Sequence, residues 1–70
     1  MNSDVIENNF SYHTPKGNQQ DRYVMIRSQA KALAHTLHDL CPKHSRETAL
    51  AFTKLEEAVM WANASIARNE

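Results

Sequence analysis

The chain has 70 residues, with eight Lys and Arg side chains, eight Asp and Glu side chains and a formal net charge of zero. This balance excludes a general binder of DNA or RNA, which carries a clear positive excess, although it leaves room for a small cationic pocket. A single cysteine excludes an intrachain disulfide, so a chain this short needs a metal ion or further copies of itself for stability.

The sequence contains no internal repeat and no low-complexity tract. No stretch approaches the roughly 20 consecutive apolar residues that span a membrane. The first residues lack the basic start and the apolar core of a secretory signal. We therefore expect an intracellular, reducing environment, in which a lone cysteine stays unpaired.

The N-terminal part divides into a polar stretch and a short aromatic arm. Residues 1–9 are polar and acidic apart from Val5 and Ile6, and we expect a flexible N-terminus there. The arm that follows is formed by Phe10, Tyr12 and His13. Residues 14–17, with proline second and glycine fourth, fit a type I turn.

Two long helices are expected, the first over residues 19–40 and the second from Ser45 to about Arg68. Asn18 is a good N-cap for the first helix, which ends before Pro42 because a residue that precedes proline avoids the helical region. Ser45 caps the second helix, which contains no Gly or Pro. Each helix carries an apolar stripe at 3–4 spacing. The stripes are Tyr23, Ile26, Ala30, Leu33, Leu37 and Leu40 in the first helix, and Phe52, Leu55, Val59, Ala62 and Ile66 in the second.

A short link between two long helices predicts an all-α fold, an antiparallel two-helix hairpin with an N-terminal aromatic arm over residues 10–70. Two paired helices have no enclosed interior, so the off-stripe residues Leu50, Met60 and Trp61 are candidates for a surface between copies. Alternatively, the arm folds over them, with Phe10 or Tyr12 stacked on Trp61. We predict that the protein self-associates.

Groups suited to a phosphate-bearing ligand gather in the arm and the first helical turns. Backbone N–H groups at a helix start attract anions, guanidinium groups grip phosphate in a fork, and aromatic rings stack on bases. The set is Tyr12, His13, Lys16, Gln19, Arg22 and Arg27. It is typical of a nucleotide site. The simpler interpretation is a solvated helix face, with Arg22 paired to Asp21 or Glu7.

Metal and catalytic sites are weakly indicated. Cys41 and His44 have C-x-x-H spacing near His35 and His38, but Pro42 separates the pair and no second cysteine completes a zinc site. The adjacent Glu56 and Glu57 point about 100° apart on a helix and cannot share a proton unaided. No Gly-rich phosphate loop and no nucleophile motif is present. We predict no metal, no cofactor and no enzymatic activity.

Two motifs and the turn between them point to a known family. The first motif is Phe10-x-Tyr12-His13-x-Pro15 with Gln19, Arg22-Tyr23 and Ile26-Arg27. The second is LEEAVMWANA over residues 55–64, followed by Ile66-Ala67-Arg68. With Cys41-Pro42 at the turn, residues 10–70 resemble the phage anti-CBASS cyclic-oligonucleotide sponges. CBASS is a bacterial defence in which a cyclase makes cyclic nucleotides that activate a killer effector.

The resemblance implies a compact homo-hexamer that binds cyclic di- and trinucleotides without cleaving them, in the cytoplasm of the infected bacterium. It implies a dinucleotide pocket with Tyr12 and Arg27, to which we add His13 and Lys16 from the same region. It implies a trinucleotide pocket with Arg68 and, more weakly, Gln29. Some relatives have Lys where this chain has Arg27, which leaves the ligand preference open.

The alternative function is that of a helical adaptor that binds a host protein through Leu50, Met60 and Trp61. An adaptor would lose function on Trp61→Ala and tolerate Arg27→Ala and Arg68→Ala. A sponge would lose binding of one ligand class on Arg27→Ala and binding of the other on Arg68→Ala.

Overall fold

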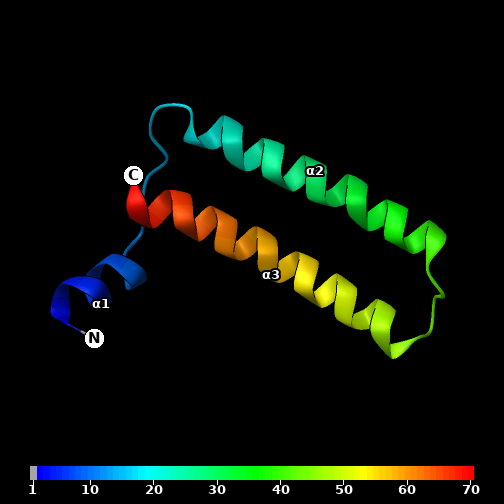
Figure 1. Ribbon diagram of the computed structural model, residues 1–70. Coiled ribbons are helices and arrows are strands. Elements are labelled where there is room, and N and C mark those ends of the chain that lie inside the picture. The colour runs from blue at the N-terminus through cyan, green and yellow to red at the C-terminus, as the bar shows by residue number, and fades with distance from the viewer. Residues whose placement is uncertain (1) are drawn as a thin grey trace.

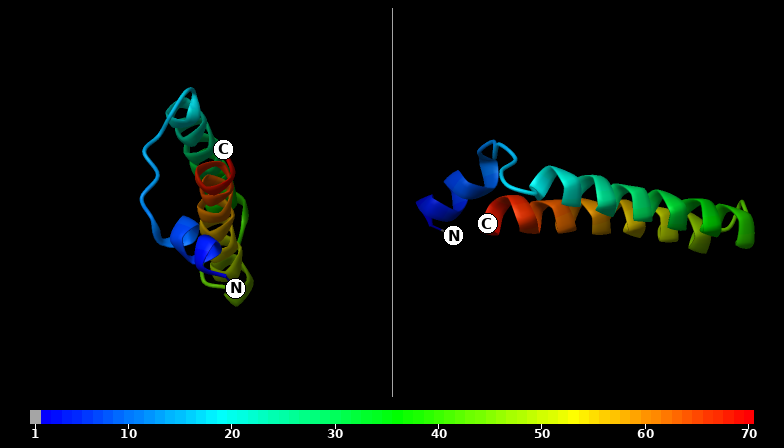
Figure 2. Two further views of the ribbon diagram at one scale, coloured as in Figure 1. Left: turned by 90° about the vertical axis from the view of Figure 1, so that its left-hand side faces the viewer. Right: turned by 90° about the horizontal axis from the view of Figure 1, so that it is seen from above.

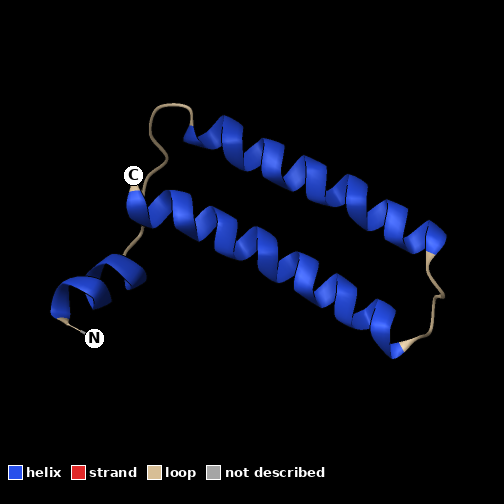
Figure 3. Cartoon of the chain, viewed as in Figure 1, coloured by secondary structure: helices blue, strands red, loops and turns tan. Residues whose placement is uncertain are grey.

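The computed structural model describes residues 2–70, and the elements in this range are three helices: α1 (Ser3–Phe10), α2 (Gln19–Leu40) and α3 (Arg46–Asn69). Helices α2 and α3 run antiparallel side by side, and α1 lies near the end of α3 (Figure 1). Loops join α1 to α2 and α2 to α3 (Figure 3). The all-α hairpin is confirmed. No helix within residues 2–70 is long and apolar enough to cross a membrane.

The link between α2 and α3 forms as the sequence predicts. Cys41 ends α2 in an extended conformation, with φ −105° and ψ 152°, as a residue before proline must. The Ser45 hydroxyl caps α3 by accepting the Thr48 N–H at 3.0 Å. The Thr48 hydroxyl donates to the Pro42 carbonyl at 2.7 Å, and Thr48 is buried beneath the turn. These bonds fix the start of α3 against the end of α2.

The predicted turn over residues 14–17 is wrong in its position. The hydrogen-bonded turn runs from Lys16 to Gln19, whose N–H donates to the Lys16 carbonyl at 3.1 Å. Gly17 occupies its second position with φ +57°, in the left-handed region that glycine adopts without strain. Gly17 therefore sets the register of the turn, and Pro15 lies before it. Asn18 takes the N-cap position of α2, but its side chain makes no capping bond.

The predicted two-helix fold misses α1. The Asn2 side chain caps this helix by accepting the Val5 N–H at 2.9 Å, and Asp4 lies in its first turn. The Asn8 amide donates to the Arg68 carbonyl at 3.0 Å, which attaches α1 to the end of α3. A segment of eight residues with only three apolar side chains is too short for the apolar periodicity from which helices are predicted.

The seam between α2 and α3 follows the predicted stripe on α3 and departs from it on α2. All five predicted α3 residues are partly buried. On α2, Leu33 is 47% exposed and Leu40 is 79% exposed, and Ala34 is partly buried in the seam instead. A helix has 3.6 residues per turn, so Ala34 lies closer to the line of Ala30 than Leu33 does, and the seam takes Ala34 before it returns to the predicted Leu37.

The chain is a flat plate one helix thick. Its extents are 44 × 29 × 13 Å, and an α-helix with side chains is itself about 10–12 Å across. No apolar side chain within residues 2–70 is fully buried. The chain exposes 5700 Å², whereas a compact monomer of 8.0 kDa exposes about 4450 Å². The turned views in Figure 2 show both broad faces of the hairpin open along most of their length.

Candidate functional site

The hollow that gathers the most predicted site residues lies where α1, the arm and the open end of the hairpin meet. It has a volume of about 410 Å³, and we name it the arm groove. It is lined by Asn9, Ser11, His13, Tyr23, Arg27, Asn63, Ala64, Ala67 and Arg68. These residues come from three separate parts of the sequence, so the groove exists only when the hairpin closes and α1 is attached.

Helix geometry explains why the two arginines meet there. Tyr23 and Arg27 are four residues apart on α2 and share a face. The antiparallel hairpin returns the end of α3 to the start of α2, which places Arg68 across from them. The hairpin therefore returns Arg68 to the arm. The Asn8–Arg68 bond then brings the arm over the same place.

His13 is oriented by a contact within the arm. Its Nε2 lies 2.7 Å from the Asn8 carbonyl oxygen. A carbonyl only accepts, so Nε2 carries the hydrogen of this contact and Nδ1 faces away from the Asn8 carbonyl. The Ser11 hydroxyl donates to the Glu7 carbonyl. Ser11 is thus engaged with the backbone and is not paired with a general base.

The chemistry of the arm groove suits an anion with hydrogen-bond donors. Arg27 and Arg68 supply guanidinium groups that bind phosphate in a fork, and His13 supplies an imidazole. The Oδ1 atom of Asn63 is buried and has no hydrogen-bond partner. A buried acceptor left unpaired costs free energy, so this atom favours a ligand that donates to it. Ala64 and Ala67 leave room for such a ligand.

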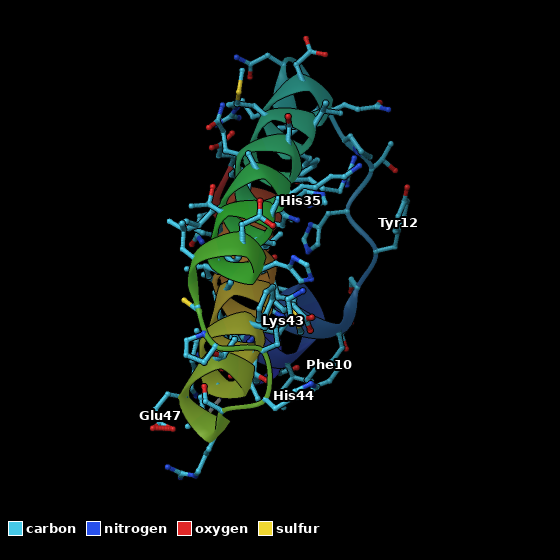
Figure 4. All side chains as sticks on the ribbon, turned by 90° about the vertical axis from the view of Figure 1, so that its right-hand side faces the viewer. Phe10, Tyr12, His35, Lys43, His44 and Glu47 are labelled. Atoms are coloured by element: carbon cyan, nitrogen blue, oxygen red, sulfur yellow. The ribbon has the colours of Figure 1, made fainter. Side chains whose placement is uncertain are left out.

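Three predicted site residues lie outside the arm groove. Tyr12 belongs to the arm but is 85% exposed, and its side chain points away from the hairpin (Figure 4). Lys16 is exposed in the turn before α2. Gln29 is two residues from Arg27, about 200° around α2, and its amide points to the Met25 sulfur at 3.8 Å. One chain therefore brings together His13, Arg27 and Arg68 but not the other three.

Two further candidates have a structural role that the sequence did not reveal. Arg22 pairs with Glu70, and the predicted partners Asp21 and Glu7 are wrong. Gln19 is only 4% exposed and donates to the same carboxylate at 3.3 Å. Hydrogen bonds from Arg22 and then Gln19 lower the pKa of Glu70 to about 2, and the Glu70 bond raises the pKa of Arg22. We name these three residues the clasp. It ties the end of α3 to the start of α2.

The turn end of the plate carries the histidines of the metal interpretation. His38, Cys41, Lys43 and His44 line a hollow of about 260 Å³ there. His38 pairs instead with its neighbour Asp39, Nδ1 to Oδ1, at 3.2 Å. Within residues 2–70 no three His, Cys, Asp or Glu side chains are placed to hold a metal ion.

The arm does not cover the off-stripe apolar residues. Phe10 is 84% exposed and Tyr12 is 85% exposed, while Trp61 and Met60 are 63% and 66% exposed. The alternative in which an arm ring stacks on Trp61 is therefore wrong for the single chain. The polar contacts of Asn8 and His13 hold the arm at the end of α3, away from Trp61.

Comparison with known protein families matches residues 2–67 to the Acb2/Tad1, hairpin domain. The match includes α1, α2 and all but the last residues of α3. No curated protein and no solved structure matches the chain.

Proposed function

The chain belongs to the Acb2/Tad1 hairpin-domain family of phage cyclic-nucleotide sponges, which act against CBASS and Thoeris defence without catalysis. From this membership and the arm groove we propose its ligands and its mode of action. It binds cyclic di- and trinucleotides, keeps them intact and so prevents a CBASS effector from being activated. The place of action is the cytoplasm of the infected bacterium, where the signal is made.

The observation that supports this proposal most directly is the meeting of His13, Arg27 and Arg68 in the arm groove. A cyclic oligonucleotide carries one negative charge per phosphate and flat bases with amino or imino donors. The Arg27 guanidinium suits a phosphate of the dinucleotide, the Arg68 guanidinium suits a phosphate of the trinucleotide, and the unpaired Oδ1 of Asn63 suits a base donor. The neutral net charge fits as well, because a small anion needs a few placed cations and not a basic surface.

The other three site residues, Tyr12, Lys16 and Gln29, join the arm-groove residues when copies meet in a homo-hexamer. Tyr12, His13, Lys16 and Arg27 serve the dinucleotide, and Arg68 with Gln29 serves the trinucleotide. Tyr12 and Gln29 are exposed in the single chain and lie off its arm groove, as expected of residues that complete a pocket on another copy. The excess exposed surface of the plate supports the same assembly.

Sequestration is tested by recovering the ligand. The protein is mixed with a cyclic dinucleotide, the free ligand is removed by gel filtration, and the protein is then digested with a protease. The proposal predicts release of the intact cyclic dinucleotide in proportion to the protein. Release of a linear product would show an enzyme, and no retained ligand would show that dinucleotides are not bound. The same experiment with a cyclic trinucleotide tests the second ligand class.

A second function is favoured by one observation, the exposure of Met60 and Trp61 next to each other on α3. A helical adaptor would use these side chains to bind a host protein. Trp61→Ala separates the two functions. A Trp61→Ala sponge whose assembly is intact retains nucleotide as the unchanged chain does. An adaptor loses its function with Trp61→Ala and retains no nucleotide with or without the substitution.

A further inference from the structure

A second hollow adjoins the arm groove along the same face of the hairpin. It has a volume of about 400 Å³ and is lined almost entirely by apolar atoms. Its floor includes Ala30, Ala34, Phe52, Val59 and Met60, and three charged residues, Arg27, Lys31 and Glu56, border it. Arg27 also lines the arm groove, so the two hollows are neighbours. We name the second one the apolar groove. Nothing in residues 2–70 fills it.

Helix α1 has an exposed apolar side. Val5, Ile6 and Phe10 are 41%, 45% and 84% exposed, and α1 buries no residue. Its charged residues are acidic, Asp4 and Glu7, and it has no basic residue. The Asn8 amide attaches α1 to the hairpin by donating to the Arg68 carbonyl, and the Asn8 carbonyl contacts His13 of the arm. The apolar side is thus free for another surface.

We propose that α1 of one copy docks in the apolar groove of a second copy. The lengths agree, because eight helical residues span about 12 Å and the groove runs from Arg27 to Ala34, about 10 Å along α2. The charges agree as well, because the groove is bordered by two cations, Arg27 and Lys31, against one carboxylate, Glu56, and this net positive rim suits the acidic helix. The Asn8–Arg68 bond keeps α1 at the end of its own α3, beyond its own groove.

The position of α1 makes this contact reciprocal. Phe10, Tyr12 and His35 lie on the same side of the hairpin in Figure 4, and His35 lies in a hollow that shares Lys31, Ala34 and Phe52 with the apolar groove. The left view of Figure 2 shows α1 and the arm standing out from that one face. When a projection and its receptor share a face, a two-fold axis lets each copy fill the other's groove.

The area available is sufficient for a stable contact. The plate exposes about 1250 Å² more than a compact monomer of its mass, and a standard interface buries about 800 Å² per partner. Covering the apolar groove and the apolar side of α1 would therefore account for much of the excess.

This inference rests on the self-association included in the proposed function, and the experiment separates the two. Size-exclusion chromatography with light scattering first gives the oligomeric state of the full chain. Two differently tagged populations in a Cys41→Ser background, one with Phe10→Cys and one with Met60→Cys, are then mixed and treated with a short bismaleimide. We expect a cross-link between the two tags. The matched control replaces Met60→Cys with Met25→Cys, which is similarly exposed but lies about 200° from Arg27 on α2.

An exchange of charges gives a second test without cysteines. Lys31→Glu should weaken self-association at least about tenfold, and mixing it with Glu7→Lys should restore the affinity between unlike chains. A monomer in solution would overturn both self-association and this docking. An oligomer that cross-links through Met25 and not Met60, or that forms Phe10 cross-links only within one chain, would overturn the docking alone. Circular dichroism on every variant confirms that the helices remain.

Discussion

Replacing Arg68 with alanine probes the arm groove at its most informative position. The substitution removes a partly buried guanidinium from the groove but leaves the backbone carbonyl that accepts the Asn8 bond. The helix that carries it should be unharmed, because alanine is the best helix former. The variant therefore changes ligand contacts while α1 stays attached.

The magnitude follows from the contact that is lost. A hydrogen bond to a charged group contributes about 1.5–3 kcal/mol, which corresponds to roughly 10- to 150-fold in affinity. We expect Arg68→Ala to weaken binding of a cyclic trinucleotide by that factor and to leave a cyclic dinucleotide within about twofold. Arg27→Ala should show the opposite preference. Isothermal titration calorimetry with each ligand, at fixed ionic strength, measures both effects.

Arg46→Ala is the matched control. It removes the same charge from the first residue of α3, at the opposite end of the plate from the arm groove. If Arg46→Ala weakens binding as much as Arg68→Ala does, the effect is one of overall charge. If Arg68→Ala binds both ligands as tightly as the unchanged chain, with the assembly intact, the assignment of Arg68 is refuted.

Three further substitutions test the clasp, the cap of α3 and the unpaired amide. The pKa of Glu70 is lowered from 4.5 to about 2, so its contribution to stability is present above pH 4.5 and is lost as pH falls toward 2. Glu70→Gln should remove this part of the acid transition followed by circular dichroism, and an unchanged transition would contradict the clasp. Ser45→Ala should cost about 1 kcal/mol and lower Tm by roughly 4–8 °C in calorimetry, whereas Ser45→Asn should keep most of the cap. Asn63→Leu should raise Tm of the free protein, because it removes a buried unpaired acceptor, and should weaken ligand binding in the same melts. A lower Tm with unchanged binding would mean that the Asn63 oxygen is paired in the free protein.

The local structure of the hairpin was predictable because local rules determine it. Ser45 and Pro42 mark helix ends through capping and pre-proline geometry, which act within a few residues, and Asn18 takes the predicted N-cap position of α2 without a capping bond. The α3 stripe was predictable for the same reason, since its spacing is a property of one helix. The α2 stripe fails only at Leu33, where Ala34 lies closer to the seam, and at Leu40 at the end of the helix, while Leu37 is partly buried as predicted.

Contacts between distant residues were not predictable. Arg22 and Glu70 are 48 residues apart, and no local pattern indicates that the carboxylate reaches the start of α2. The attachment of α1 depends on Asn8 and the Arg68 carbonyl, a backbone group that the sequence does not mark. The arm groove was predicted in part, because the hairpin alone returns Arg68 to the arm.

The clasp changes the role of the first turn of α2. From the sequence, Gln19, Arg22 and the helix start form an anion site. In the fold, the Glu70 carboxylate of the same chain occupies it. Arg27, one turn further along, is exposed and makes no hydrogen bond or ion pair with the described residues. Position along the helix thus separates an arginine that closes the hairpin from one that is free to meet phosphate.

Native mass spectrometry of the full chain with an excess of a cyclic nucleotide tests the central claim most directly, because one spectrum gives the number of copies and the mass of what they hold. The account predicts a homo-oligomer, a hexamer on the proposed assembly, whose added mass equals that of intact cyclic ligands. A monomer without ligand, or an oligomer carrying a hydrolysed product, would contradict it.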